Sequence, residues 1–336
     1  MTSHRTVLVT GGAGYIGSHT VRALLEAGWN PVVFDDLSTG HREAVPPHVP
    51  FVEASLSDLE TVQKALRDHR PWAVVHFAAC IEVGESVIDP ARFYWNNVVN
   101  TLNLLDAVRH EGVARLVFSS SAGVYGVPPT VPIPEDAPMR PVNPYGTTKA
   151  TVERILGDYR RAYGLRTLSL RYFNACGAHP DGDIGEAHPA KTHLVECALL
   201  HALGVRPEIT IFGTDYDTRD GTAVRDYVHV MDLAHAHLLA LEALDRKDLP
   251  PAYNVGLGTG FTVQEVLDAV ERITGRTLNR TLGPRRPGDP PALVADPSRI
   301  RQDLGWTPRY QTLDAMVASA WQWHRTHPRD FGRSLP

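Results

Sequence analysis

The sequence predicts an α/β fold in which a doubly wound parallel sheet is followed by a smaller α/β region. Two observations predict this fold. Short runs rich in valine, leucine and phenylalanine, typical of buried strands, alternate with segments of helical periodicity through the first half of the chain. Beyond Cys176 the pattern changes, because residues 177–191 are rich in glycine, histidine and aspartate and strand-like runs become rarer.

The length agrees with two regions. A chain of 336 residues is long for a single core and sufficient for two coupled domains. We expect residues 1–175 to form the first domain and residues 176–336 the second, with residues 224–244 returning to the first.

Composition excludes several classes of function. The apolar content of 43% and the charged content of 21% are ordinary for a globular protein. A formal net charge of −5 and the lack of a lysine/arginine run argue against nucleic acid as a partner. Cys80, Cys176 and Cys197 have no metal-ligand spacing and cannot all pair, so we expect a reducing compartment and no metal site. No apolar run is long enough to cross a membrane and the first strand begins too early for a signal peptide, so we expect a cytoplasmic protein.

Apolar periodicity and capping signals place the individual elements. Capping boxes at Ser57-x-x-Glu60 and Thr262-x-x-Glu265 predict helix starts, and Asp296-Pro297 predicts an N-cap followed by proline at the first helical position. The predicted strands are residues 6–9, 31–34, 51–52, 72–75, 116–118, 167–170, 209–212 and 224–230. The predicted helices are residues 18–27, 57–66, 90–110, 145–163, 193–203, 231–243, 262–273, a short one from 297, and 313–323.

A glycine-rich turn, Thr10-Gly-Gly-Ala-Gly-Tyr-Ile-Gly17, joins the first strand to the first helix. Its glycines fit both Gly-x-Gly-x-x-Gly and Gly-x-x-Gly-x-x-Gly. The unpaired N–H groups and the positive dipole end of the helix suit a diphosphate. An ordinary glycine turn is the alternative, but a strand, a helix and an acidic pair all lie where a dinucleotide-binding βαβ unit needs them.

The acidic pair is Asp35-Asp36 at the end of the second strand. A carboxylate at this place accepts hydrogen bonds from a ribose 2′-hydroxyl and repels a 2′-phosphate. No arginine follows the strand immediately. The sequence therefore predicts NAD rather than NADP as the cofactor.

Polar residues gather where the predicted parallel strands end, which is where ligands bind in such sheets. Ser119-Ser120-Ser121 stands at one such end, although strand termination alone would also explain the serines. The ends of two other strands are His76-Phe77-Ala78-Ala79 and Arg171-Tyr172-Phe173-Asn174.

Tyr145 and Lys149 stand four residues apart on a predicted helix and therefore project from one face. An ammonium about 4–5 Å from the phenol, at an effective dielectric near 20, would lower the tyrosine pKa by about two to three units. We therefore expect Tyr145 to act as an acid/base with a depressed pKa.

Together these features resemble the extended short-chain dehydrogenase/reductase superfamily and, within it, the UDP-glucose 4-epimerase family. The resemblance covers nearly the whole chain. The motifs that carry it are residues 10–20, 76–79, Ser121, Tyr145-x-x-x-Lys149, Val83-Gly-Glu-Ser86, 171–174, Val224-Arg-Asp-Tyr227 and Arg285-Arg-Pro-Gly-Asp289.

The resemblance implies a role for each part of the chain. The first domain would be an NAD-binding Rossmann fold and the second would bind a UDP-sugar. Tyr145 would be the acid/base, Lys149 would orient the nicotinamide ribose, and Ser121 would bind the sugar O4. Further NAD-binding residues would be Gly11, Gly14, Tyr15, Ile16, Gly17, Asp35, Leu56, Phe77, Ala78, Ala79, Asn97, Ser119 and Tyr172. Further substrate-binding residues would be Asn174, Leu194, Phe212, Arg225, Arg286 and Asp289.

The activity implied by the resemblance is interconversion of UDP-galactose and UDP-glucose through a 4-keto intermediate with bound NAD, by a homodimer. Epimerisation of another UDP-sugar is the alternative, since Leu293 and Gly123 stand at positions that differ within the family. A 4,6-dehydratase is disfavoured because Ser120-Ser121-Ala122 lacks the acidic pair that elimination of water needs.

Overall fold

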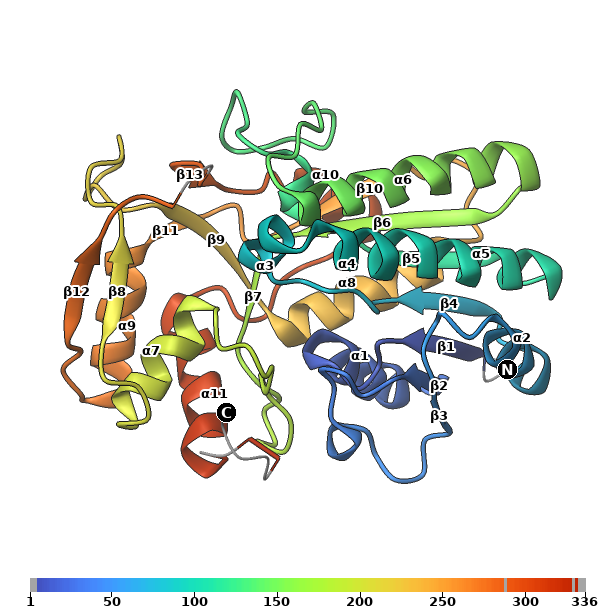
Figure 1. Ribbon diagram of the computed structural model, residues 1–336, viewed down its shortest axis with the longest axis horizontal. Coiled ribbons are helices and arrows are strands. Elements are labelled where there is room, and N and C mark those ends of the chain that lie inside the picture. Colours follow the sequence, from blue (N-terminus) through green and yellow to red (C-terminus); the bar gives the residue numbers. More distant parts are fainter. Residues whose placement is uncertain (1–4, 287–288, 328–329, 332–336) are drawn as a thin grey trace.

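The computed structural model describes residues 5–286, 289–327 and 330–331 (Figure 1). A seven-stranded sheet, with the order β10-β6-β5-β4-β1-β2-β3, forms the larger half. Every neighbouring pair in it is parallel. Its strands are β1 (Thr6–Thr10), β2 (Asn30–Asp35), β3 (Phe51–Glu53), β4 (Ala73–His76), β5 (Arg115–Ser119), β6 (Arg166–Tyr172) and β10 (Ala252–Val255).

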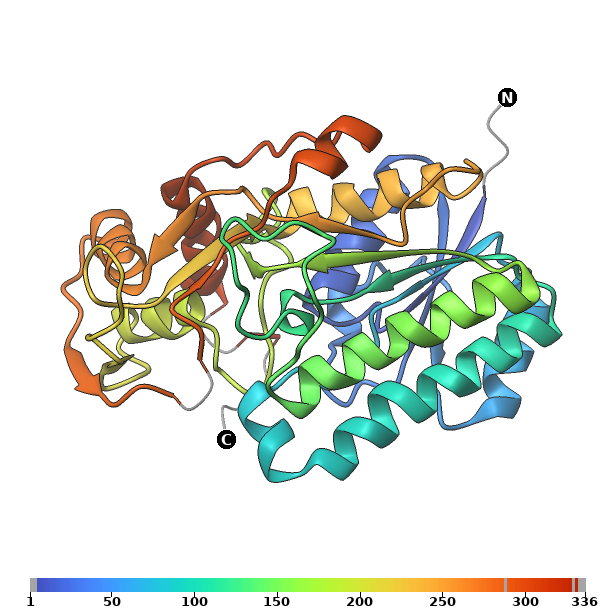
Figure 2. The ribbon, with the colours of Figure 1, turned by 90° about the horizontal axis from the view of Figure 1, so that it is seen from above.

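Helices cover both faces of this sheet, which explains why its strands are almost continuously apolar. On one face lie α2 (Leu59–His69), α5 (Asn100–His110) and α6 (Pro144–Tyr163), which pack on Leu8, Val74 and Leu116. Figure 2 shows α5 and α6 running along that face. On the other face lie α1 (Tyr15–Glu26), α8 (Val230–Ala243) and α10 (Ser298–Leu304). The predicted doubly wound parallel sheet is confirmed.

The smaller half contains two small sheets. In one, β9 (Val224–His229) pairs with β7 (Asn174–Cys176), β11 (Gly260–Thr262) and β13 (Ala292–Leu293). The other consists of β8 (Ile209–Phe212) and β12 (Arg280–Gly283). Three helices pack around a second core with these strands: α7 (Leu194–Ala202), α9 (Val263–Thr274) and α11 (Leu313–Thr326).

Residues 224–244 divide between the two halves. The strand β9 lies in the small sheet, whereas α8 packs against α1 on the large sheet. The boundary at residue 175 stays a prediction. The chain then returns once more, since β10 pairs with β6 at the edge of the large sheet.

Several short elements differ from the sequence-based expectation. The expected helix 90–110 consists of α4 (Pro90–Tyr94), a π-helical turn η2 (Trp95–Val99) and α5. The strands β7, β10, β11, β12 and β13 and the helix α3 (Val83–Ile88) were not predicted. The 3-10 turns η1 (Arg42–Ala44) and η3 (Ala122–Val124) were not predicted either.

Two of the three predicted caps are wrong by one residue. Asp58, not Ser57, caps α2, because its carboxylate accepts hydrogen bonds from the N–H (3.1 Å) and the hydroxyl (2.6 Å) of Thr61. Pro297 is the N-cap of α10 rather than its first residue, while the Asp296 carboxylate accepts from the Ser298 N–H at 3.0 Å. The capping box of Thr262 and Glu265 on α9 is confirmed.

Within the part of the chain that the structure describes, no helix combines the length and apolarity needed to span a bilayer.

Buried histidines give the fold a predictable dependence on pH. Burial lowers the pKa of His76 and His229 to about 3 and that of His19, His237 and His324 to about 4. The unfolded chain binds protons at these histidines below about pH 6.5 while the folded chain does not, so stability falls as the pH drops from about 6.5 towards 4. Each group contributes up to about 1.4 kcal/mol per pH unit in this window.

Urea denaturation at a series of pH values measures this dependence. His237→Gln should make the loss of stability between pH 6.5 and 4 shallower, because His237 is fully buried. His48→Gln is the matched control, since His48 is exposed. Equal slopes for the two variants would contradict the prediction.

Candidate active site

The predicted site residues of the large sheet lie along one edge. Because all seven strands are parallel, their carboxyl ends meet there. These ends carry the glycine turn after β1, Asp35 as the last residue of β2, residues 76–79 at the end of β4, and Ser119 as the last residue of β5. The strand β6 leads through Phe173 directly into β7, so this edge continues into the smaller half.

The glycine turn is a place of close backbone approach. A Cβ at Gly17 would lie 2.1 Å from the Gly11 carbonyl oxygen, and one at Gly11, which has a φ of 72°, would lie 2.6 Å from the Ala78 nitrogen. Gly14 is the N-cap of α1 and supplies no side-chain cap. The first N–H groups of α1 therefore suit an anionic ligand, and the turn fits the diphosphate of a dinucleotide.

Asp35 stands beside this turn at the end of β2. Its carboxylate accepts hydrogen bonds from the Ala13 N–H at 2.9 Å and the Leu37 N–H at 2.8 Å. Burial raises the pKa of Asp35, while these two bonds oppose that rise. The carboxylate is thus fixed against the glycine turn, as recognition of an adenosine ribose requires. Leu56, another predicted cofactor contact, is buried in the same hydrophobic core as Phe34.

The π-helical turn positions the loop after β4. The Asn97 side chain accepts from the Cys80 N–H at 2.8 Å and donates to the Cys80 carbonyl and the Thr148 hydroxyl, both at 3.0 Å. All its polar atoms are therefore engaged with the protein. Asn97, predicted as a cofactor ligand, connects the Cys80 loop to α6.

The remaining predicted cofactor contacts lie around the glycine turn and the β4 end. The Phe77 and Ala78 N–H groups both donate to the Thr10 carbonyl, at 2.9 and 3.2 Å. Ala79 is half-buried, and Ile16 packs against the core beneath α1. The Tyr15 hydroxyl donates to the Gly177 carbonyl at 2.5 Å, which joins the turn to the segment after β7.

Tyr145, Lys149 and Ser121 come together where α6 begins beside the end of β5. Tyr145 and Lys149 are buried on the same face of α6, and the Lys149 Nζ lies 5.9 Å from the centre of the Tyr145 ring. The Lys149 ammonium donates to the Ser119 carbonyl at 2.9 Å. A hydrogen bond joins the side chains of Ser121 and Tyr145. The Ser119 and Tyr172 hydroxyls lie 2.8 Å apart, so these predicted residues also meet.

The pKa values of this pair correct the sequence-based expectation. The pKa of Tyr145 is raised, because burial outweighs the lowering effect of the Ser121 hydrogen bond, and Glu82 raises it further. Burial also lowers the pKa of Lys149 to about 7. The expectation of a depressed tyrosine pKa in the protein alone is wrong, since it considered the charge of Lys149 without the burial of both groups.

The predicted substrate residues of the smaller half form two contacts. Arg225 on β9 makes an ion pair with Asp289, and the guanidinium of Arg286 lies 4.2 Å above the Phe212 ring. Asn174 donates to the Asp226 carbonyl at 3.0 Å, and Leu194 begins α7. Residues 287–288 of the predicted motif 285–289 lie outside the described residues.

A buried ion pair that was not predicted from the sequence lies next to Ser120. The Arg171 Nη2 lies 2.6 Å from Glu153 Oε2, and both side chains are only 6% exposed. The Ser120 hydroxyl donates to the same carboxylate at 2.5 Å, so the pair orients the strand end that carries Ser121. The signal was available, because Glu153 follows Lys149 by four residues on α6 and so shares its face.

A profile of the NAD dependent epimerase/dehydratase family matches residues 7–256. The chain belongs to this family, and NAD is its cofactor. UDP-glucose 4-epimerases are among its full-length relatives. The UDP-glucose 4-epimerase of Azospirillum brasilense is 51% identical over 328 residues, covering 98% of this chain and 94% of that protein.

Solved structures agree with this relationship. A UDP-glucose 4-epimerase crystal structure matches with a TM-score of 0.95 and 41% identity, covering 98% of this chain and all of that one. The enzyme from Bifidobacterium longum, solved in complex with NAD⁺ and UDP, matches with a TM-score of 0.92 and 38% identity, covering 96% of this chain and 99% of that one. The predicted family is confirmed.

The close approach at Gly17 gives a first test of the cofactor site. Gly17→Ala should reduce bound NAD at least about tenfold and destabilise the protein by about 1–3 kcal/mol, because its Cβ would displace the backbone at Gly11. Nucleotide released from the purified protein measures the first effect, and thermal unfolding measures the second.

Gly157→Ala is the matched control. Gly157 lies inside α6, and its Cβ would have only ordinary contact, at 3.7 Å, with the Arg161 side chain. This change should preserve NAD binding and add up to about 1 kcal/mol of stability. Equal NAD content in both variants would show that the turn does not bind the cofactor.

Proposed function

We propose that this chain interconverts UDP-galactose and UDP-glucose by reversible oxidation at C4 of the sugar. The observation that carries the proposal is the buried group of Tyr145, Lys149 and Ser121 at the same sheet edge as the glycine turn. Its full-length similarity to UDP-glucose 4-epimerases supports the same conclusion.

Tyr145 is the proposed acid/base. Its phenolate removes the O4 proton as the C4–H bond breaks, and the phenol returns a proton to O4 when that bond forms again. Bound NAD supplies the chemistry of hydride acceptance and return. Ser121 binds the Tyr145 side chain and is placed to hold O4 within reach of it.

Lys149 is the proposed partner of the phenolate. At a pKa of about 7 its amine takes up a proton readily near neutral pH. An ammonium there and a phenolate at Tyr145 stabilise one another in a buried site, so the two groups titrate as a coupled pair. The hydrogen bond from the Lys149 Nζ to the Ser119 carbonyl holds the ammonium on the face of α6 that also carries Tyr145.

Arg225, Arg286, Asp289, Asn174, Phe212 and Leu194 are the proposed UDP-binding residues. Arginine binds diphosphate oxygens through paired N–H donors, and an aromatic face suits a base. Anchoring through UDP lets the hexose be held loosely enough to turn between the two hydride transfers.

The range of sugars is a second question. Leu293 is half-buried on β13, where its register partner is Arg225, and it packs on the core beside Ala122 and Phe173. A Cβ at Gly123 would lie 3.4 Å from the Ser121 hydroxyl and 3.7 Å from the Tyr145 ring. Leu293 and Gly123 therefore adjoin the proposed sugar site, and larger UDP-sugars such as UDP-N-acetylglucosamine are the alternative substrates.

We also propose a cytoplasmic homodimer. All three cysteines are free, and two of them, Cys176 and Cys197, are buried thiols, which supports a reducing compartment. Apolar side chains are exposed along α3 and at the start of the π-helical turn η2, among them Val87 (64%), Ile88 (85%) and Trp95 (67%). A second copy of the chain covering this face would remove that apolar surface from water.

Incubation with UDP-galactose without added nucleotide tests the activity. The purified protein should form UDP-glucose without net reduction of NAD. Tyr145→Phe should lower kcat by about 10²–10⁴-fold, the size of a lost general acid/base, while NAD stays bound. Tyr163→Phe, on the exposed end of the same helix, should retain full activity.

Other outcomes of this assay are equally informative. Stoichiometric consumption of added NAD would identify a dehydrogenase and contradict the proposal. Faster conversion of UDP-N-acetylglucosamine than of UDP-galactose would favour the alternative substrate, and Leu293→Ser should then increase that preference.

Sedimentation tests the dimer. Ile88→Glu should convert the protein to a monomer, since it places a charge in the centre of the apolar face formed by α3 and its neighbours. Leu282→Glu on β12, where leucine is 71% exposed, is the control and should leave the mass unchanged. A wild-type monomer at micromolar concentration would contradict the proposal.

A further inference from the structure

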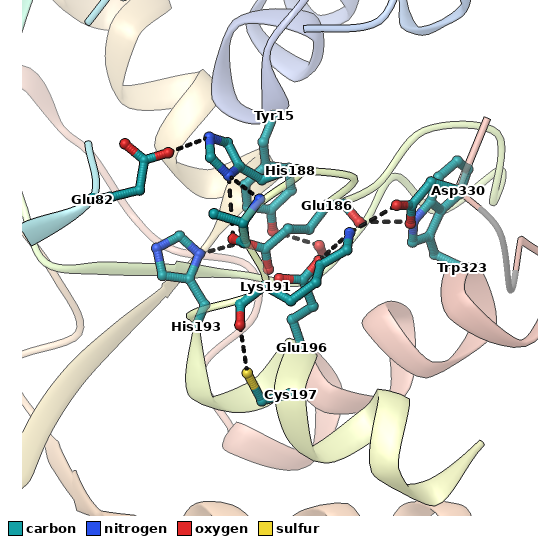
Figure 3. A network of polar contacts seen from close by, with 12 residues as sticks. Tyr15, Glu82, Glu186, His188, Lys191, His193, Glu196, Cys197, Trp323 and Asp330 are labelled. Carbon is teal, nitrogen blue, oxygen red and sulfur yellow. Dashed lines mark hydrogen bonds and ion pairs between the residues drawn. The ribbon is translucent and has the colours of Figure 1, made fainter. Parts of the chain in front are cut away.

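Residues 185–193 form a segment, here called the strap, that leads from β7 to Leu194 at the start of α7. The strap is tied to the smaller half through α7 and α11. Glu186 pairs with His193 within the strap, and the Glu186 carbonyl accepts from the indole of Trp323 on α11 at 3.2 Å. The Lys191 ammonium binds Glu196 and Asp330, both at 2.8 Å (Figure 3).

The strap is also tied to the large sheet. The His188 Nε2 lies 3.1 Å from Glu82 Oε1, with side-chain exposures of only 14% and 8%. Figure 3 shows Glu82 entering from the opposite side and pointing at the His188 ring. His41, beside η1, adds a contact of 2.7 Å between its Nε2 and the Ala187 carbonyl.

Contacts with the Ala190 backbone fix the orientation of the His188 ring. Its Nδ1 lies 3.2 Å from both the nitrogen and the carbonyl oxygen of Ala190, which fixes the ring with Nε2 facing Glu82. On the other side, Glu82 Oε2 accepts from the Ile81 N–H at 3.2 Å. The orientation of each side chain is therefore fixed by a backbone contact of its own, in addition to the contact between them.

Glu82 lies near enough to Tyr145 for its charge to raise the pKa of that phenol, and it contacts the strap through His188. It is the N-cap residue of α3 and follows the loop that Asn97 ties to α6. Its charge raises the pKa of Tyr145, and it also contributes to raising that of His193, for which Glu186 is the main cause. Through its contact with His188, Glu82 thus connects the surroundings of Tyr145 to the strap that leads to Leu194.

We propose that Glu82 and His188 are positioning residues that hold the strap closed against the loop after β4 while the oxidised sugar turns. This inference rests on the proposed function. After oxidation, the C4 hydride resides on the cofactor and the O4 proton on Tyr145, and both must return to the same sugar. If the 4-keto sugar escapes, the protein retains NADH and turnover stops.

The experiment uses the holoenzyme with UDP-galactose. Glu82→Gln and His188→Ala should each raise KM about tenfold, the size expected for loss of a hydrogen bond to a charged group. His188→Ala, which leaves the charge of Glu82 in place, should leave the initial kcat nearly unchanged. Both variants should also accumulate bound NADH, seen as absorbance at 340 nm, as turnover proceeds. The double variant should be no worse than the more impaired single one, because the two side chains act through one contact.

Glu85→Gln is the matched control. Glu85 lies on the same short helix and pairs with Arg92 at 2.9 Å, without reaching the strap. It should leave KM and NADH accumulation as in the wild type. The exchanged pair, Glu82→His with His188→Glu, should recover at least part of the KM.

Two results would overturn the inference. One is that Glu82→Gln and His188→Ala behave like Glu85→Gln in both KM and NADH accumulation. The other is a double variant whose KM effect is the product of the single effects, which would show that the residues act separately. Hydrogen exchange of residues 185–193 in the holoenzyme, faster in Glu82→Gln than in Glu85→Gln, tests the closure without turnover. An inactive wild type would contradict the proposed function and leave that measurement to decide on the strap.

Discussion

Parallel pairing of all seven strands is the constraint on which the proposed active site depends. Helices cover both faces of the sheet, so the strand interiors accept apolar side chains such as Val9, Val75 and Val117. Polar groups that can meet a ligand then collect at the strand ends, and the parallel direction brings those ends to one edge. Because β6 runs on into β7, which pairs with β9, the same edge also reaches the strand that carries Arg225.

The buried charged groups near this edge differ in the hydrogen bonds that stabilise them. Arg171 and Glu153 satisfy each other through paired N–H donors, and Tyr125 and Ser120 bind the same two groups. Lys149 has a carbonyl partner at Ser119, and its pKa falls because of burial. The first arrangement is fixed by several hydrogen bonds, whereas Lys149 can change protonation. This difference separates a scaffold from a group suited to proton chemistry.

Sequence was sufficient for several elements that local pattern decides, although two of the three helix caps were misplaced by one residue. The glycine turn, the early strands and the Thr262 capping box depend on neighbouring residues, and they were predicted correctly. The strand β10 was missed because its place depends on pairing with β6, far earlier in the chain. The roles assigned to the site residues remain proposals.

The pKa of Tyr145 could not be predicted for a related reason. Spacing on a helix shows that Tyr145 and Lys149 share a face, but not how deeply that face is buried. The depth is set by η3, the loop after β4 and the end of β5, which come from distant parts of the chain. Glu82 was likewise missed, because its partner His188 lies on a segment without periodic pattern.

The path of the chain at β10 has a consequence for how the two halves can move. The polypeptide passes from β6 to β7, back through α8, and again from β10 to β11 before α10 returns to the large sheet. Several segments of the chain therefore connect the two halves, in place of a single flexible linker. A large hinge opening would have to bend all of them together, so substrate exchange is better served by small local displacements of surface segments than by separation of rigid bodies.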